Sequence, residues 1–217
     1  MHLKRQKIPK SWPIPRKGTK FLAKASHEKT NSIPLIVVIR DILKITKTNN
    51  ELKKLINNKQ ILINGKEIRE TNYPINLFDS IGFPLIKKYY RSVLKGKKIY
   101  FEEISEKEAE SKIYKVVGKK LLKNNKIQLN LNSGKNILSS EKANINDFVI
   151  LNNNDNKIVK TISLGKGSEV VVVRGKHIGA IGKIKDIQEE GENDIAELET
   201  KDGDIKVELN NLFVVKK

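Results

Sequence analysis

The side chains best suited to chemistry in this sequence are its lysines and arginines, and that chemistry is the binding of phosphate groups. The chain of 217 residues has 43 Lys and Arg against 25 Asp and Glu, a formal net charge of +18. Such a surplus predicts a polyanionic partner, either a nucleic acid or an anionic membrane surface. Most of the cations are lysines, which bind phosphate as point charges, whereas arginines also read base edges. The composition therefore favours contacts to a nucleic-acid backbone over sequence reading.

Groupings typical of catalysis, metal binding or nucleotide binding are not found in the sequence. The histidines His2, His27 and His177 lie far apart, and cysteine is absent, so neither a metal site nor a disulfide is expected. Residues 165–168, Gly-Lys-Gly-Ser, lack the glycine spacing and the Lys-Ser order of a phosphate loop. The glutamates within residues 102–110 favour a solvated helix face over an acid–base pair. We expect no enzyme activity, no cofactor and no metal.

The elements that must position the cations begin with a basic segment, residues 1–32, without helical or strand periodicity. Its nine Lys and Arg face one acid, Glu28. Pro9, Pro13 and Pro15 disfavour a helix and favour an extended path. Such a segment is either a disordered tail or an arm that becomes ordered against phosphate. Trp12 is expected to anchor it on a base or in a protein groove.

Residues 33–86 have the pattern of two helices, a hairpin and a further strand. An apolar stretch opened by Pro34 favours a helix to residue 45, although its β-branched residues also allow a strand. Arg40, Lys44 and Lys47 would then share one helix face. The capping box Thr48-Asn-Asn-Glu51 opens a second helix. Asn-Gly at 64–65 predicts a tight hairpin with positive φ, and a strand follows near residues 80–84.

This region resembles known RNA-binding proteins. The stretch ILINGKEIRETNYPINLFDSI at 61–81 resembles the S4-type RNA-binding domain. More widely, four stretches together resemble the archaeal and eukaryotic small-subunit ribosomal protein family S4e: HLKR at 2–5, PKSW at 9–12, IPLIVVIRDILK at 33–44 and YPINLFDSI at 73–81. The resemblance implies a site in the body of the small subunit, on the large ribosomal RNA, and a role in early assembly.

Beyond residue 86 the chain is expected to be mostly strand. A capping box at Ser105 opens a short helix to about Lys112. The expected strands, interrupted by a turn at 123–126, lie at 114–122, 126–131, 148–151 and 158–164. Three tyrosines lie within or just after the basic run from Lys87 to Lys98: Tyr89, Tyr90 and Tyr100. They either pack into a core or leave one ring to stack on a base.

The last stretch, residues 166–217, contains glycines at 175, 179 and 182 between β-branched runs, with a turn expected at 201–204. It resembles the KOW motif, which implies an SH3-like β-barrel. The expected fold is thus an α+β chain of several modules: a basic extended N-terminal arm (1–32), a small two-helix-plus-hairpin RNA-binding domain (33–86), a β-rich central domain (87–165) and a C-terminal SH3-like KOW β-barrel (166–217).

The candidate RNA-binding residues are, with one aromatic exception, side chains that carry or can gain positive charge. They are Lys4, Arg5, Lys7, Lys10, Trp12, Arg16, Lys17, Arg40, Lys44, Lys53, Lys54, Lys66, Arg69, Lys87, Lys88, Arg91, Arg174, Lys176 and His177. In contrast, residues 186–208 contain ten acids against two lysines. That stretch is expected to face solvent or a basic protein neighbour, with Lys183 and Lys185 facing RNA.

These observations predict a structural constituent of the small ribosomal subunit, in the cytoplasm, that binds ribosomal RNA and neighbouring ribosomal proteins. No membrane partner is expected, since no apolar run is long enough to span a bilayer. No homo-oligomer is expected either. The alternatives are an RNA-modifying enzyme such as a pseudouridine synthase, or a KOW transcription-elongation factor. The enzyme would need a separate catalytic domain, for which little sequence remains. A basic membrane-surface protein is disfavoured because no strongly amphipathic helix is found.

Overall fold

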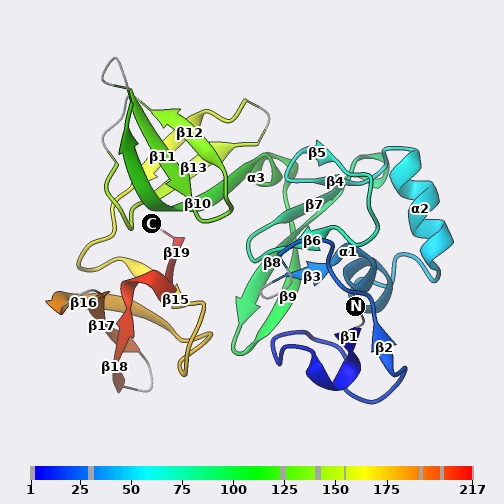
Figure 1. Ribbon diagram of the computed structural model, residues 1–217, viewed down its shortest axis with the longest axis horizontal. Helices are drawn as coiled ribbons and strands as arrows, with labels where there is room; N and C mark the ends of the chain where they lie inside the picture. The colour runs from blue at the N-terminus through cyan, green and yellow to red at the C-terminus, as the bar shows by residue number, and fades with distance from the viewer. Residues whose placement is uncertain are drawn as a thin grey trace. The chain divides into compact units, whose positions relative to one another are not determined.

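The computed structural model describes residues 3–28, 32–122, 126–139, 143–153, 155–190, 193–200 and 203–216. Within the chain two compact units are distinguished, Met1–Lys112 (unit 1) and Ile113–Lys217 (unit 2). Both are mostly β, with few and short helices (Figure 1). His2 lies outside the described residues, as do parts of the turns predicted at 123–126 and 201–204.

The N-terminal segment folds onto unit 1, so the prediction of an extended arm is wrong for residues 3–28. Strands β1 (Leu3–Lys4) and β2 (Phe21–Leu22) pair antiparallel, with a 3-10 turn at Arg5–Lys7 between them. Ile8, Trp12 and Ala25 are buried, and burial of such apolar surface is what stabilises an otherwise polar segment. The prolines exclude a helix but not this compact loop.

The first predicted helix is present, and it is buried nearly all round. β3 (Ile33–Pro34) leads into α1 (Leu35–Val37), which continues as a π-helical turn, Val38–Ile42, where Leu43 N donates to Val38 O at 2.8 Å. The chain then turns through Lys44, whose φ is +56°. Because the helix ends before this residue, Arg40, Lys44 and Lys47 do not share a helix face, contrary to the prediction.

The second helix begins as predicted. In α2 (Asn49–Asn57) the hydroxyl of the N-cap residue Thr48 accepts from Glu51 N at 3.2 Å. The carboxylate of Glu51 accepts from Lys47 N at 2.8 Å, one residue before the cap. Leu52 and Ile56 form the buried face of the helix, which leaves its lysines exposed.

A five-stranded sheet, in the order β5-β4-β7-β8-β9, forms the centre of unit 1. Asn64 and Gly65 have φ values of +49° and +74°, which confirms the predicted tight hairpin between β4 and β5. The boundary expected at residue 86 falls inside this sheet, because β7 pairs with β8. The strands of unit 1 not yet bounded are β4 (Leu62–Ile63), β5 (Lys66–Glu67), β6 (Pro74–Ile75, paired with β3), β7 (Ser80–Phe83), β8 (Lys88–Lys95) and β9 (Lys98–Ile104).

A buried ion pair connects the hairpin turn, the central sheet and the last residue of unit 1. Asp79 is 3% exposed and pairs with Lys112. Its carboxylate also accepts from Asn64 Nδ2 at 2.8 Å and from the backbone N–H of Asn76 at 2.7 Å. All three donors point at one carboxyl group, so the charge of this buried acid is compensated on several sides.

Both hydrogen bonds of the capping box predicted at Ser105 are present. It opens α3 (Glu106–Ala109), which is shorter than predicted. The helix ends at Ala109 because strand β10 (Ser111–Leu121) begins two residues later, and Lys112 lies in that strand.

Unit 2 contains two five-stranded sheets. The first, in the order β12-β11-β10-β13-β14, packs its apolar face into a core that includes Val116, Leu129, Leu131, Val149 and Leu151. Its predicted strands are confirmed, and β12 was not predicted. Their bounds are β11 (Ile127–Leu131), β12 (Asn136–Ser139), β13 (Phe148–Asn152) and β14 (Ile158–Ile162).

The second sheet of unit 2 is antiparallel throughout, in the order β18-β17-β16-β15-β19. Its buried side chains include Val170, Val172, Ile184, Leu198 and Val214. The chain reaches β19 through a 3-10 helix. The bounds are β15 (Glu169–Val172), β16 (Ile181–Glu190), β17 (Asn193–Thr200), β18 (Gly203–Glu208), the 3-10 helix Leu209–Asn211 and β19 (Leu212–Lys216).

The glycines of this sheet are required for two different reasons. Gly175 and Gly179 have φ values of +94° and +84°, as the sequence predicted. Gly182 does not, but a Cβ there would lie 2.6 Å from the backbone oxygen of Glu199 on the neighbouring strand.

Replacing Gly182 by alanine is therefore expected to push β17 away from β16 and to destabilise unit 2 by about 1–3 kcal/mol. Urea unfolding followed by circular dichroism measures the loss. Gly165→Ala is the control, because a Cβ at that glycine meets nothing within 4 Å. Equal stabilities of the two variants would contradict the prediction.

Candidate RNA-binding surfaces

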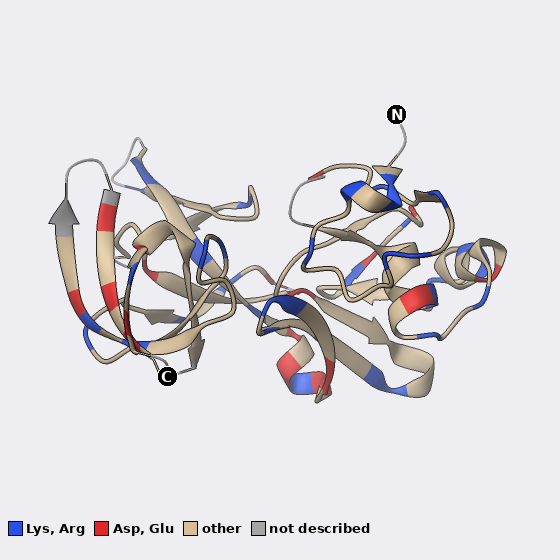
Figure 2. Cartoon of the chain, turned by 90° about the horizontal axis from the view of Figure 1, so that it is seen from below, with Lys and Arg blue, Asp and Glu red and all other residues tan. Residues whose placement is uncertain are grey.

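The positive charge is concentrated in unit 1. Residues 1–112 contain 25 Lys and Arg against 11 Asp and Glu, whereas residues 113–217 contain 18 against 14. The net charges are thus +14 and +4. In Figure 2 the blue cations are spread over the N-terminal segment, α2 and the strands of unit 1, and most of the red residues of unit 2 lie on β16–β18. A phosphate-binding surface is accordingly expected first on unit 1.

The N-terminal segment presents exposed cations on a folded loop. Of the residues predicted to bind RNA here, Lys4, Lys7, Lys10, Arg16 and Lys17 are exposed. These five side chains are available to phosphate.

Two predicted RNA contacts of this segment are instead directed inward. The guanidinium of Arg5 donates to Thr19 O and Pro15 O, both at 2.7 Å, so it closes the loop. Trp12 is 5% exposed, which excludes stacking on a base and leaves the protein groove as its anchor. Beside it, Ile99 N donates to Ser11 O at 2.9 Å and thereby joins the segment to β9.

Around α2 the cations are exposed, with one exception. The exposed candidates are Lys44, Lys53, Lys54, Lys66 and Arg69. The remaining candidate, Arg40, is half-buried and forms a two-fold hydrogen bond with its neighbour Asp41, at 2.8 Å for each donor; this pairing raises the pKa of the guanidinium. Its charge is therefore largely compensated within the protein.

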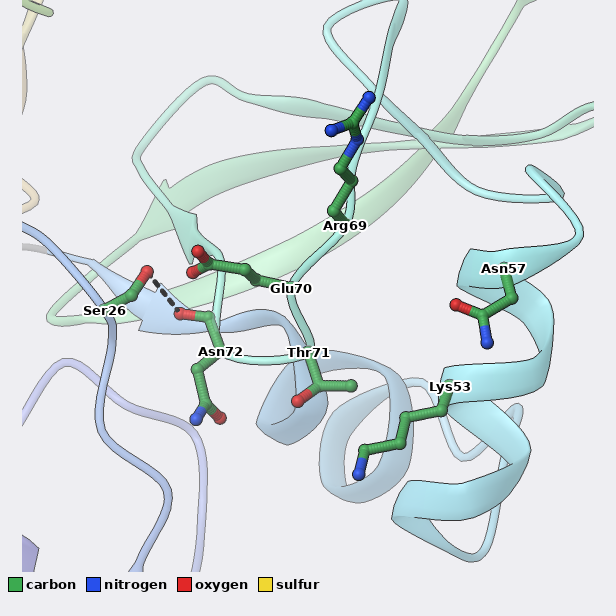
Figure 3. A pocket seen from close by; sticks show the side chains of 7 residues that line it. All are labelled: Ser26, Lys53, Asn57, Arg69, Glu70, Thr71 and Asn72. Atoms are coloured by element: carbon green, nitrogen blue, oxygen red, sulfur yellow. Dashed lines mark hydrogen bonds between the residues drawn. The ribbon is translucent and has the colours of Figure 1, made fainter.

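An open hollow of about 430 Å³ lies between α2, the segment 69–72 and the N-terminal segment. Figure 3 shows Lys53 and Asn57 reaching toward it from α2, with Ser26 on the other side. The hydroxyl of Ser26 donates to Asn72 O at 3.4 Å, and Arg69 points away from Lys53. The lining combines amide, hydroxyl and cationic groups with the carboxylate of Glu70, so it suits a polar ligand rather than an apolar one.

The β8–β9 hairpin presents Lys87 and Lys88 to solvent but turns Arg91 inward. Arg91 Nη2 donates to Ser111 O at 3.0 Å and to Glu108 O, and burial lowers the pKa of this guanidinium. Arg91 is thus held by the backbone at the end of α3, contrary to its prediction as an RNA contact.

The three tyrosines of this hairpin differ in their surroundings. Tyr89 donates to Glu106 Oε1 at 2.6 Å, and Tyr90 packs edge-on against Phe83 with ring centroids 6.2 Å apart. Tyr100 is 44% exposed. Of the two interpretations left open by the sequence, core packing therefore applies to Tyr90 and a free ring to Tyr100.

In unit 2 the connection between β15 and β16 exposes Arg174 and Lys176, with His177 half-buried beside them. All three were predicted to contact RNA. They lie on a loop whose backbone is shaped by the glycines at 175 and 179. This loop is the exposed basic segment of the second sheet.

The strands β16–β18 carry opposite charges facing one another, not a purely acidic face. Lys185 pairs with Asp204, and Lys166 pairs with Asp186 at 2.8 Å. The register also places Lys183 opposite Glu199. Lys183 and Lys185 are both exposed, so their contact with RNA stays a prediction, although acids across the strands partly compensate their charge.

Among the cations of unit 2 that the structure describes, Lys115 is the one whose burial strongly lowers its pKa. It is 5% exposed, donates to Leu209 O, and lies 5.9 Å from the ring centre of Phe148. Desolvation lowers the pKa of this ammonium from 10.5 to about 8. The hydrogen bond to Leu209 ties β10 to the 3-10 helix that precedes β19.

Unit 2 is expected to become more stable by about 2–3 kcal/mol as the pH rises from about 8 to 10.5. In this window the unfolded chain still holds the Lys115 proton that the folded chain has released, so raising the pH favours folding. Urea unfolding by circular dichroism at each pH measures the rise. Lys115→Met removes the titrating group and should flatten the curve relative to the parent chain; an identical pH dependence in both would contradict this assignment.

Metal sites and membrane-spanning helices are both absent from the described part of the chain. No group of three or more His, Asp or Glu side chains there could hold a metal ion. Over the same residues, no helix has the length and apolarity required to cross a bilayer.

Comparison with known proteins gives consistent matches over the whole chain. A sequence model described as "Ribosomal family S4e" matches residues 86–158. The protein named small ribosomal subunit protein eS4 in Methanocella arvoryzae is 36% identical over 222 residues, covering 100% of this chain and 94% of that protein. The protein of the same name in Archaeoglobus fulgidus is 33% identical, with the same coverage.

A solved structure agrees with the fold. The crystal structure of the 30S ribosomal protein S4e from Thermoplasma acidophilum superimposes with a TM-score of 0.71 at 24% sequence identity, covering 87% of this chain and 97% of that one. The full-length similarity to the eS4 proteins establishes the relationship that the residues at 2–5, 9–12, 33–44 and 73–81 indicated. The chain belongs to the ribosomal protein family S4e.

Proposed function

We propose that this chain is a structural constituent of the small ribosomal subunit, which binds and stabilises ribosomal RNA and so supports translation in the cytoplasm. The observation that carries the proposal is similarity along the whole chain to proteins named small ribosomal subunit protein eS4. The charge of +14 on residues 1–112 supports it, because an RNA backbone is the polyanion such a surface requires. The family is one of structural ribosomal proteins and not of enzymes.

We assign the RNA contacts to exposed cations that form no ion pair with an acid among the described residues. They are Lys4, Lys7, Lys10, Arg16 and Lys17 of the N-terminal loop, Lys53 and Lys54 of α2, Lys66, Arg69 beside the hollow, Lys87, Lys88, Arg174 and Lys176. Such side chains bind phosphate without reading sequence, so RNA shape should dominate recognition. Arg5, Trp12, Arg40 and Arg91 act instead as structural residues.

We also propose a domain assignment for two parts of the chain. We regard residues 33–86 as an S4-type RNA-binding domain, supported by its capped helix α2 and its Asn-Gly hairpin. Residues 166–217 would form the KOW barrel, supported by the five antiparallel strands and by the glycines at 175 and 179. Neighbouring ribosomal proteins would contact the surfaces that the RNA leaves open.

Sedimentation of a cell extract through a sucrose gradient tests this function. The tagged chain should sediment with small ribosomal subunits at moderate ionic strength and leave them as salt is raised. Recovery at the top of the gradient at moderate salt would overturn the proposal. So would co-purification with RNA polymerase in place of small subunits, or formation of modified nucleosides in ribosomal RNA.

A further inference from the structure

The end of the β8–β9 hairpin presents an unusual set of side chains on one face. In this antiparallel pair, Val93 lies opposite Tyr100 and Lys95 lies opposite Lys98. Side chains alternate along a strand, and directly opposite residues share a face. Tyr100 therefore lies on the same face as Val93, Lys95, Lys98 and Glu102, and as Arg91, whose guanidinium is held by the backbone at the end of α3.

The ring of Tyr100 on this face is open. It is 44% exposed, whereas Leu94 and Ile99, which point to the opposite face, are each 8% exposed. Among the described residues, Tyr100 forms neither a hydrogen bond like that of Tyr89 nor a ring contact like that of Tyr90. An exposed ring supported from one side by a half-buried valine is a platform on which another flat group can stack.

The charges around the ring favour an anion. Two lysines directly opposite one another repel, and this arrangement destabilises an isolated hairpin. Glu102 pairs with Lys95, but no acid of the described chain pairs with Lys98. Lys97 is also exposed, in the turn that follows Gly96. A bound anion would relieve the repulsion at the hairpin end.

A second basic segment meets this hairpin on the free edge of β9. The hydrogen bond from Ile99 N to Ser11 O places the N-terminal loop beside the residue that precedes Tyr100. Its neighbour Lys10 is exposed, and thus adds a further cation along the same edge. Two basic segments far apart in the sequence are in this way joined at one place.

We propose that the open face of the β8–β9 hairpin end binds one unpaired nucleotide of RNA, with its base stacked on Tyr100 and its flanking phosphates on the adjacent lysines. This proposal rests on the function proposed above and names the RNA feature that is recognised at this position. An unpaired nucleotide satisfies both parts of the surface, because it combines an exposed aromatic face with negative charge. An acidic protein segment would satisfy the lysines alone.

Fluorescence anisotropy of the whole chain with two RNAs tests the proposal. One RNA is a single strand of ten nucleotides, and the other is a blunt duplex of the same sequence. Tyr100→Leu is expected to weaken single-strand binding by roughly 5- to 150-fold, the range for loss of one stacked base. Duplex binding should be unchanged. Tyr100→Phe keeps the ring and should bind both RNAs like the parent chain.

Leu138→Ala is the control for loss of an exposed apolar side chain, since Leu138 is 63% exposed and lies outside the proposed RNA contacts, and it should bind both RNAs normally. Emission of Trp12 verifies that each variant is folded. Parent-like single-strand binding by Tyr100→Leu, or equal losses at positions 138 and 100, would overturn the inference and favour a protein neighbour at the hairpin. Either result leaves the proposed function standing, because that function is tested separately, by sedimentation of the chain with small subunits.

Discussion

Replacing Asp79 by alanine is expected to lower the free energy of unfolding of unit 1 by about 3–5 kcal/mol. The substitution leaves the ammonium group of Lys112, which is 8% exposed, without its counter-charge. It also removes the acceptor for Asn64 Nδ2 and for the N–H of Asn76. Urea unfolding measured by Trp12 fluorescence follows this unit alone, because Trp12 is the single tryptophan of the chain and is buried in unit 1.

Two comparisons make this prediction specific to the buried pair. Glu67→Ala breaks the exposed ion pair between Lys59 and Glu67, whose atoms lie 3.0 Å apart, and should change stability by at most about 1 kcal/mol. The double variant Asp79→Leu with Lys112→Met removes both charges and should recover the part of the loss caused by the unpaired ammonium, but not the part caused by the unpaired donors of Asn64 and Asn76. If Asp79→Ala is no less stable than Glu67→Ala, the pair does not hold unit 1 together.

The parts of this fold that could be predicted are those determined within a few residues. Thr48 and Ser105 cap their helices because the bonded groups are three residues apart. Asn64 and Gly65 form a tight turn because both tolerate positive φ. These signals need no knowledge of the rest of the chain, and the structure confirms them.

The parts that could not be predicted depend on distant contacts. Composition made residues 3–28 resemble a disordered arm, but Ser11 is bonded to Ile99 and Ser26 to Asn72. The division expected at residue 86 failed for the same reason, since β7 continues its pairing into β8. Trp12 was the one local signal, because a large apolar side chain in a polar segment usually has a partner in the fold.

The sequence predicts that the candidate RNA-binding surface is positively charged. It does not predict which of the cations are exposed and free to bind phosphate. Arg5, Arg40 and Arg91 all bind within their own unit. A guanidinium has five donors in a rigid fork, so it also serves to connect backbone carbonyls or to pair with a neighbouring acid. Lysines at comparable positions are exposed, so the candidate RNA-binding cations that remain available are mainly lysines.

Neutralising four lysines of the N-terminal loop is expected to weaken binding to small-subunit ribosomal RNA by roughly 10³-fold at 0.1 M salt. The variant carries Lys4→Gln, Lys7→Gln, Lys10→Gln and Lys17→Gln, all at exposed positions. Each lost phosphate contact reduces the slope of log K against log salt by about 0.7–0.9, so the total change is about 3 to 4. Filter binding over a salt series measures both quantities. Deleting the loop would be a poorer test, because Ile8 and Trp12 are part of the core.

The control removes the same amount of charge from the second sheet of unit 2, with glutamine at Lys166, Lys183, Lys185 and Lys206. Two of these lysines pair with Asp186 and Asp204, and the register sets the other two opposite Glu199 and Glu197. Their charge is already compensated, so this variant should keep the parent salt slope despite its equal net charge. Equal losses in the two variants would mean that RNA responds to net charge alone, and that the folded N-terminal loop is not a binding surface.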